Sequence, residues 1–371
     1  MATEVLPDER ALRFSRRERA LAAMAEHDLD ALVLGRPANV RYVAGVPLLW
    51  NAGARPFGPG CVLLSSGDIY LLTTWDEGVP DEIPHDHLYG ITWNPMNLVS
   101  VLQKIGDAHQ PRRVGTDALS PLFAKLLPTA FPGADVVDGE PALRQARAVK
   151  TDDEIAAIRL SLSVAEAGLA TAVAALSPGA SRRGIAGLFM EAIAARGVTI
   201  PATQNVVRIA SSRPGADGDR VEAGDLVAFD AGVVAGGYTG EVARTHVAGE
   251  ANGNAARVRS LYQRWDELWD RLIDACQPGA RGSALLTAYE TAGEELPAEP
   301  VARGLGLGLD EPVVVRDLPA TAAAQRLDPG AVLYLTARVA DSGVGEVIGS
   351  EAVLITATGP QVLTSSPFWH R

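Results

Sequence analysis

The sequence predicts two domains, an α/β domain over residues 1–138 and an α+β domain over residues 139–371. Three observations predict this organisation. The chain has 371 residues, and at roughly 150 residues per domain that length corresponds to two domains. Up to Asp138, short apolar runs alternate with helical stretches, which is the pattern of an α/β domain. Beyond residue 200, paired strands and long helices follow one another in separate runs, which is typical of an α+β domain.

The first domain is expected to open with a helix over residues 16–27, where apolar positions recur at helical spacing. The continuous apolar run Ala31–Leu34 then predicts a buried strand. Two apolar runs within residues 60–73 flank a Ser-Ser-Gly-Asp turn and predict a hairpin. Helical stretches over residues 98–105 and 121–130 complete the alternation.

The second domain is expected to begin with a long amphipathic helix over residues 149–176. Thr151 and Glu154 stand three residues apart and form a capping box, and the segment Ser177-Pro-Gly ends the helix. The remaining elements are predicted as a helix from Ser181 toward Arg196, strands within 221–249, helices over 254–275 and 283–295, and strands within 332–364.

Composition and charge exclude several classes of protein. Hydrophobic residues make up 47% of the chain and charged residues 21%, as in ordinary globular domains. Cys61 and Cys276 are the only cysteines, which favours a reducing compartment, and we expect the cytoplasm. The net charge of −12 disfavours nucleic acid as a partner. Since no apolar run reaches about 18 residues and no apolar leader opens the chain, we also expect no membrane partner.

Four segments carry a resemblance to a known family. They are residues 224–249 (GDLVAFDAGVVAGGYTGEVARTHVAG), 144–161 (RQARAVKTDDEIAAIRLS), 306–312 (GLGLDEP) and 351–364 (EAVLITATGPQVLT). In this order and spacing they resemble the family of creatinase, prolidase and aminopeptidase P. The resemblance implies an N-terminal α/β domain, a C-terminal α+β domain of the pita-bread type, and a homodimer.

Most members of that family are hydrolases with two metal ions held by five side chains. The resemblance places those five positions on Asp230, Glu241, Leu305, Thr336 and Ser350. A further histidine, which contacts substrate in the family, corresponds to Pro312. Two carboxylates therefore remain of the five ligands.

These replacements disfavour a metal centre. Divalent transition metals need several N, O or S donors that converge at about 2 Å, and a leucine at position 305 fills the coordination volume with hydrocarbon. We therefore predict no cofactor and no tightly bound catalytic metal. A weak Mg²⁺ or Ca²⁺ site on Asp230 and Glu241 stays open, because these ions accept carboxylate and water ligands.

Asp230 and Glu241 are the catalytic candidates. We expect them on adjacent strands of one hairpin, with both side chains facing inward. Two carboxylates a few ångströms apart raise each other's proton affinity, so one can act as a general acid beside its ionised partner. The alternative is a relic pair that an arginine or hydrogen bonds neutralise.

Arginines and hydroxyls near the former metal positions are the candidates for substrate binding. Thr336 and Arg338 stand two apart on an expected strand and share a face, and the guanidinium fork of Arg338 suits a carboxylate. The further candidates are Arg303, Arg208, Tyr238, Leu305 and Ser350. For Arg338 and Arg303, a solvent-exposed side chain with no ligand is the alternative.

Two candidates in the first domain come from the resemblance. Trp50 and Arg55 lie in a loop rich in glycine and proline, and in relatives a loop at this place reaches the cavity of the partner subunit. An aromatic ring and an arginine suit a small anionic molecule. The alternative for this loop is a dimer interface.

Other conspicuous residues favour structural roles. Alternation along the strand places Arg244 and His246 on the face opposite the two carboxylates, so we expect a salt bridge for the arginine and a satisfied surface or core position for the histidine. Trp265 and Trp269, four apart on a helix, are expected to pack in the core. The glycine run at 304–308 lacks the strand-turn-helix context of a nucleotide-binding motif.

The function hypothesis follows from the surviving carboxylates. It is a metal-independent, creatinase-like enzyme that acts on a small polar molecule, at a C–N bond, with Asp230 and Glu241 as acid and base. The first alternative is a non-catalytic protein that uses the same fold for binding or scaffolding. The second is an atypical Xaa-Pro peptidase.

Overall fold

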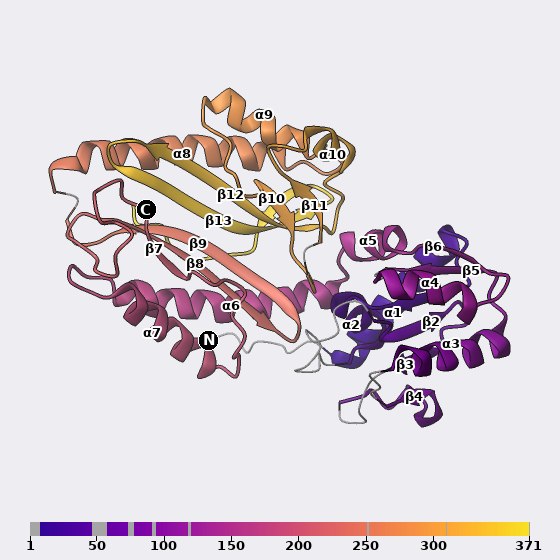
Figure 1. Cartoon of the computed structure of the whole chain (residues 1–371). Coiled ribbons are helices and arrows are strands. Elements are labelled where there is room, and N and C mark those ends of the chain that lie inside the picture. The colour runs from indigo at the N-terminus through magenta and orange to yellow at the C-terminus, as the bar shows by residue number, and fades with distance from the viewer. Residues whose placement is uncertain are drawn as a thin grey trace. The chain divides into compact units, whose positions relative to one another are not determined.

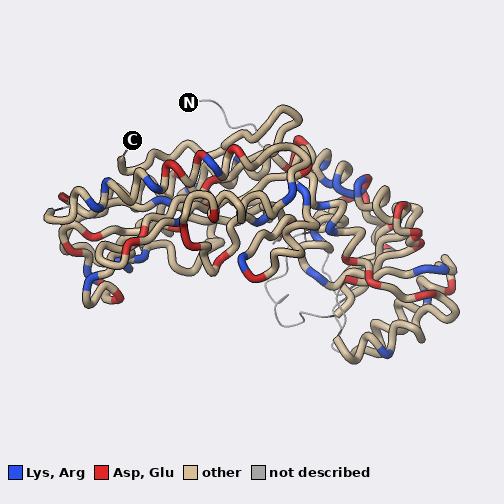
Figure 2. The backbone as a smooth tube through the Cα atoms, turned by 90° about the horizontal axis from the view of Figure 1, so that it is seen from above, with Lys and Arg blue, Asp and Glu red and all other residues tan. Residues whose placement is uncertain are grey.

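The computed structural model describes residues 8–46, 58–72, 78–90, 94–117, 120–250, 252–308 and 310–370. These residues form two compact units, one over Asp8–Arg147 and one from Ala148 onward, coloured indigo to magenta and magenta to yellow in Figure 1. Basic and acidic residues are interspersed along the backbone of both units (Figure 2).

The division after Arg147 lies beyond Asp138, where the sequence placed the end of the first domain. Helix α5 (Glu140–Ala148) accounts for the difference. The hydroxyl of Tyr42 donates to the carbonyl of Ala146 at 2.8 Å, and the Arg147 guanidinium donates to the side chain of Asn39. These buried contacts fasten α5 to the N-terminal unit.

The N-terminal unit is built on a six-stranded sheet of order β4-β3-β2-β1-β5-β6. Its elements are α1 (Glu9–Glu26), β1 (Ala31–Leu34), α2 (Pro37–Ala44), β2 (Cys61–Leu64), β3 (Ile69–Leu72), a 3₁₀ turn (His85–His87), β4 (Leu88–Tyr89), α3 (Pro95–His109), β5 (Arg113–Thr116), α4 (Pro121–Ala130), β6 (Asp135–Asp138) and α5. The predicted buried strand is confirmed as β1, which pairs antiparallel with β2 and parallel with β5. The predicted hairpin is confirmed as β2 and β3.

The C-terminal unit is built on an eight-stranded sheet of order β11-β10-β12-β13-β9-β8-β7, with β14 paired to β13. Its elements are α6 (Asp152–Ala174), α7 (Arg182–Ala194), β7 (Val207–Ile209), β8 (Leu226–Ala235), β9 (Tyr238–Val247), a 3₁₀ turn (Asn252–Asn254), α8 (Ala255–Ala275), α9 (Ser283–Ala292), β10 (Ala302–Gly304), β11 (Asp310–Val314), α10 (Pro319–Ala324), β12 (Val332–Asp341), β13 (Gly345–Thr356) and β14 (Gly359–Val362). The sheet, with α6 and α7 along one end and α8 and α9 along the other, is the α+β arrangement that the sequence predicted (Figure 1).

The helices cover one face of this sheet. On β8, the odd-numbered residues from Val227 to Val233 pack against α6 and α7. On β12, the odd-numbered residues from Leu333 to Val339 pack in the core that contains α8 and α9. Because side chains alternate along a strand, the even-numbered residues, Asp230 and Thr336 among them, lie on the opposite face.

Helix α6 begins with the predicted capping box. The Thr151 hydroxyl accepts from the Glu154 amide, and the Glu154 carboxylate accepts from the Thr151 amide at 3.0 Å. Among the described residues, α6 is the one helix long and apolar enough to cross a membrane, although half of its apolar stretch is buried in the unit. One such helix is a weak indication of a membrane span, because the core helix of a soluble protein meets the same criterion of length and composition.

The sheet has a seam between β9 and β13, which pair at Ala243 and Ser350. Beside this pair, the hydroxyl of Thr245 donates to the carbonyl of Ile348 and accepts from its amide, both at 2.9 Å. A side chain thus takes the place of backbone ladder hydrogen bonds. Strands β7, β8 and β9 lie on one side of the seam, and β10 to β13 lie on the other.

A glycine sets the distance between α6 and the sheet, and this predicts the effect of a substitution. A Cβ atom at Gly240 would lie 2.4 Å from backbone atoms of Ser161 and Leu162. We expect Gly240→Ala to reduce the free energy of unfolding by about 1–3 kcal/mol, because overpacking forces the backbone apart. Gly187→Ala, on an exposed turn of α7 with no neighbour within 4 Å, should leave stability equal or higher. Urea unfolding of both variants checks this, and equal stabilities would contradict it.

Candidate active site

Asp230 and Glu241 lie on the paired strands β8 and β9, as predicted. In the register of this pair, Asp230 is opposite Ala243 and Glu241 is opposite Gly232, so both carboxylates point to the face that the helices leave uncovered. A Cβ atom at Gly232 would lie 2.8 Å from Cγ of Glu241. The glycine therefore makes room for the longer side chain of the glutamate.

Two residues from the other side of the seam meet these carboxylates. Arg303 on β10 is opposite Tyr334 on β12. The Tyr334 hydroxyl donates to Oδ1 of Asp230 at 3.1 Å, and the Arg303 guanidinium forms an ion pair with Glu241. The same guanidinium lies over the Tyr334 ring, 4.7 Å from its centroid. The four residues form one cluster, which we call the carboxylate site.

Burial dominates the electrostatics of the carboxylate site. It raises the pKa of Glu241 to about 7, with Arg303 opposing the rise and Asp230 adding to it. Burial also raises the pKa of Asp230, against the Tyr334 hydrogen bond and the charges of Arg303 and Arg208. Glu241 therefore gains and loses its proton near neutral pH, beside a second carboxyl that burial also makes harder to ionise.

The other three former ligand positions offer no metal donor set. The hydroxyls of Thr336 and Ser350 lie 3.0 Å apart and bond to each other, and Leu305 has no exposed surface. Among the described residues, no three histidine, cysteine, aspartate or glutamate side chains converge to hold a metal. Since the site also carries a guanidinium, its residues do not fit the dinuclear metal centre implied by the family resemblance.

A second charged group lies on the same face of the sheet. The carboxylate of Glu346 on β13 pairs with Arg208 of β7 and with Arg338 of β12, whose Nε lies 2.7 Å away. Burial raises the pKa of Glu346, but the charges of Arg208 and Arg338 outweigh it and hold that pKa below its ordinary value. We call these three residues the arginine pair site. Two guanidinium groups share one carboxylate, which leaves one positive charge.

Several predicted substrate contacts lie elsewhere. Tyr238 faces α6, where its hydroxyl donates to Glu154 at 3.0 Å, so it is not a site residue. Leu305 is fully buried and Ser350 is 1% exposed, so neither presents a surface to a ligand. Pro312 lines a separate pocket that also contains Gln325 and Arg326, and no carboxylate-site residue lines it.

The structural roles expected for four other residues are confirmed. Arg244 is 1% exposed and pairs with Glu351 at 2.9 Å on the helix-covered face. The His246 ring meets that of Phe229 edge-on, and burial, aided by the Arg244 charge, lowers the pKa of the histidine to about 4. The rings of Trp265 and Trp269 stack with centroids 5.6 Å apart.

Two site residues were not predicted from the sequence, namely Tyr334 and Glu346. Tyr334 stands two residues before Thr336 on the same strand face, so alternation was a signal that could have found it. Glu346 is opposite Ala340, and no sequence spacing indicates its contact with β7. Trp50 and Arg55 lie outside the described residues.

Comparisons with known proteins agree with this fold. The family described as Metallopeptidase family M24 matches residues 156–357, and the Creatinase/Prolidase N-terminal domain matches residues 16–149. An Xaa-Pro dipeptidase of Pyrococcus furiosus is 22% identical over 95% of this chain and 98% of its own length.

Solved structures give the same result for the architecture. The Xaa-Pro dipeptidase from Bacillus anthracis has a TM-score of 0.76 at 18% identity, and the match covers 96% of this chain and 98% of that one. Dipeptidase PepE from Mycobacterium ulcerans has a TM-score of 0.73 at 22% identity and covers 97% of both chains. The chain therefore belongs to the M24 family of creatinase, prolidase and aminopeptidase P, and has its two-domain architecture with a pita-bread C-terminal domain.

Proposed function

We propose that this chain is a metal-independent hydrolase that cleaves a C–N bond in a small molecule bearing a carboxylate. The observation that carries the proposal is the carboxylate site, where Glu241 pairs with Arg303, Asp230 accepts from Tyr334, and burial raises the pKa of Glu241 to about 7. Membership of a peptidase family supports hydrolysis as the class of reaction. A dipeptide is one substrate of the required kind, and Xaa-Pro dipeptidases are among the relatives.

The proposed reaction needs one acid and one base. Ionised Asp230 removes a proton from a water molecule, whose oxygen forms a bond to the substrate carbon. Protonated Glu241 gives its proton to the leaving nitrogen as the C–N bond breaks. The products are an acid and an amine, and one water molecule is consumed. Each transfer is ordinary general acid-base catalysis.

The arginine pair site is the proposed subsite for the substrate carboxylate. Its net positive charge and the 43% and 27% exposed side chains of Arg208 and Arg338 make it suitable for an anion. The charge of Arg208 lowers the pKa of Asp230, which indicates that the arginine pair site lies near the catalytic pair.

The test is hydrolysis of a panel of Xaa-Pro dipeptides and N-carbamoyl and N-amidino amino acids, with EDTA and with added Mn²⁺. We expect turnover of at least one substrate that EDTA does not reduce. Activity only with Mn²⁺ would instead support the atypical peptidase. No turnover of any substrate would support the non-catalytic alternative, which the internal pairing of both carboxylates favours.

The subsite makes its own prediction. Arg338→Met and Arg208→Met should each raise KM about 10- to 100-fold with a smaller change in kcat, because a charge-assisted hydrogen bond to the substrate is lost. Arg257→Met breaks an arginine–aspartate pair at the far end of β12 and should leave KM unchanged. Unchanged KM in all three variants would contradict the subsite.

We also propose a homodimer located in the cytoplasm. The homodimer is what the family resemblance implies, and two free, buried cysteines support a reducing compartment. Light scattering of the purified chain tests the dimer, and a monomer at micromolar concentration would contradict it.

A further inference from the structure

The carboxylate site holds a fixed positive charge supplied by the chain itself. Arg303 forms the ion pair with Glu241, whose side chain is 5% exposed, and the arginine side chain is 22% exposed. The guanidinium also lies over the ring of Tyr334, whose hydroxyl donates to Asp230. One cationic group therefore serves both carboxylates that the family pattern assigns to metal binding.

We propose that the Arg303 guanidinium is the resident cation of this site, where it takes the place of a divalent metal ion and keeps one out. Two ionised carboxylates carry two negative charges. One guanidinium and one proton together carry the same charge as a divalent cation, so the site is neutral without a metal. This inference concerns what occupies the site and holds for any reaction performed there.

The position of Arg303 is fixed on three sides. Its strand β10 pairs with β12, and the guanidinium lies over the Tyr334 ring, whose hydroxyl bonds to Asp230. On the other side, a Cβ atom at Gly304 would lie 2.5 Å from the carbonyl oxygen of Glu311, so β10 and β11 approach closely. The guanidinium is thus held as part of the sheet.

A buried ion pair holds the segment that follows Arg303. Nζ of Lys150 lies 3.0 Å from Oδ2 of Asp310, and both side chains are at most 2% exposed. The same aspartate oxygen would lie 1.9 Å from a Cβ atom at Gly306, so the glycine run packs directly on this pair. The run can therefore not move away and take Arg303 with it without breaking a buried ion pair.

A divalent ion cannot share the site with this guanidinium. The ion would need the carboxylate of Glu241, whose Oε2 Arg303 contacts, at about 2 Å. It would also lie beside a like charge in a partly desolvated place. Removing the guanidinium leaves two carboxylates from adjacent strands. Carboxylates completed by water are a donor set that Mg²⁺, Mn²⁺ and Ca²⁺ accept.

The experiment measures Mn²⁺ binding by calorimetry and by loss of the electron paramagnetic resonance signal of free Mn²⁺. Both are measured at pH 8, so that the carboxylates are ionised. We expect no binding by the wild-type chain at about 1 mM Mn²⁺. Arg303→Met and Arg303→Gln should bind one Mn²⁺ per chain with a Kd at least about tenfold below that concentration, and the bound metal should raise the thermal midpoint by several degrees. Two variants are used so that one misfolded protein, detected by circular dichroism, does not decide the result.

Three controls locate the effect. Arg303→Lys keeps the charge and should stay metal-free. Adding Asp230→Asn to Arg303→Met should abolish the gained binding. Arg257→Met also frees a carboxylate, that of Asp341, but it lies outside the site and should gain nothing.

The outcomes separate this inference from the proposed function. Folded Arg303→Met and Arg303→Gln variants that bind no more Mn²⁺ than wild type would overturn the inference alone. A metal-free wild type with no hydrolytic activity would overturn the proposed function alone. Stoichiometric Mn²⁺ in the wild type would overturn the inference and the metal independence of the proposed reaction together.

Discussion

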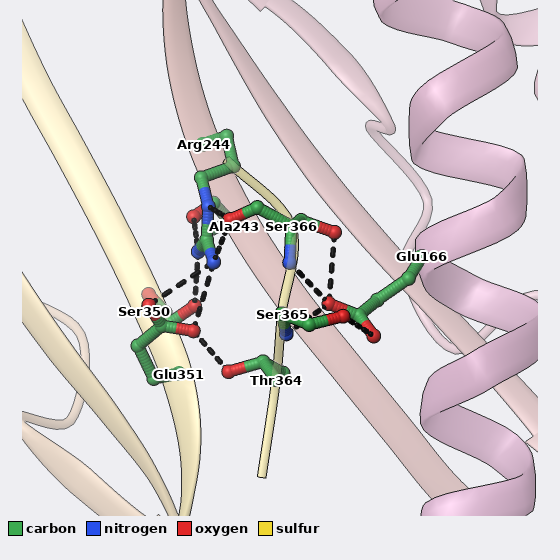
Figure 3. Close-up of polar contacts among 8 residues, drawn as sticks. All are labelled: Glu166, Ala243, Arg244, Ser350, Glu351, Thr364, Ser365 and Ser366. Atoms are coloured by element: carbon green, nitrogen blue, oxygen red, sulfur yellow. Dashed lines mark hydrogen bonds and ion pairs between the residues drawn. The ribbon is translucent and has the colours of Figure 1, made fainter. Parts of the chain in front are cut away.

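Arg244→Met is expected to reduce the free energy of unfolding of the C-terminal unit by about 3–5 kcal/mol, because it leaves a buried carboxylate without its cation. Figure 3 shows the contacts that are lost. The guanidinium bonds to both Glu351 oxygens at 3.0 and 2.9 Å, to the carbonyl of its neighbour Ala243 on β9, and to the carbonyl of Ser350 across the seam. It also donates to the carbonyl of Ser366.

The C-terminal segment makes this contact more than a local ion pair. The backbone amides and hydroxyls of Ser365 and Ser366 donate to Glu166 on α6 (Figure 3). The Phe368 ring lies over the Arg244 guanidinium, 4.0 Å from it, and packs on Trp265. Arg244 therefore joins the two strands of the seam to a segment that reaches the helices on both sides.

The loss of stability should depend on pH. Burial raises the pKa of Glu351, and the Arg244 charge opposes the rise, so removing the arginine raises that pKa further. When a carboxyl has a higher pKa in the folded than in the unfolded protein, the protein loses stability as the pH rises through the interval between the two values. The deficit of Arg244→Met should therefore be smaller at pH 5 than at pH 8.

Urea unfolding at both pH values measures this. The control is Arg183, which pairs with Asp219 and has a side chain that is 87% exposed. Arg183→Met should change the free energy of unfolding by less than about 1 kcal/mol. The double variant Arg244→Met with Glu351→Leu should recover part of the loss, since no charge is left buried. A deficit below about 1 kcal/mol in Arg244→Met would contradict the role of this residue.

The elements that could be predicted from the sequence are those with a strong local signal. Thr151 and Glu154 marked the start of α6, and the apolar run of β1 marked a buried strand with its exact bounds. Strands β7 and β10 are three residues long, too short for periodicity to indicate them. The boundary after Arg147 depends on contacts of α5 with Asn39 and Tyr42, which no local pattern specifies.

The candidate site also has parts that a local sequence pattern predicted and parts that only the fold shows. The shared face of Asp230 and Glu241 follows from one hairpin and was predicted from alternation. The ion pair between Arg303 and Glu241 joins strands on opposite sides of the seam, and no local pattern in the sequence specifies how strands distant in the chain align. An arginine that neutralises the pair was one of the alternatives predicted from the sequence, and only the fold identifies it as Arg303.

Glu241→Gln is expected to lower kcat about 10²- to 10⁴-fold on any substrate that the wild type hydrolyses, which is the usual contribution of a general acid or base. Glutamine keeps the size of the side chain and an oxygen that accepts from Arg303, but its amide has no acidic proton to transfer. Because burial raises the pKa of Glu241 to about 7, the wild-type rate should fall as pH rises through about 7, where the acid loses its proton. The residual rate of the variant should lack this fall.

The control for this prediction is Glu299→Gln, an exposed glutamate four residues before Arg303, which should keep the wild-type rate and pH profile. Arg303→Met should move the descending limb to higher pH, because the guanidinium holds the pKa of Glu241 down. A Glu241→Gln variant with at least half of the wild-type rate would contradict an acid role and favour a neutralised relic pair. If Glu241→Gln loses most of the rate but its residual rate still falls near pH 7, another group causes that fall. This result would contradict Glu241 as the proton donor.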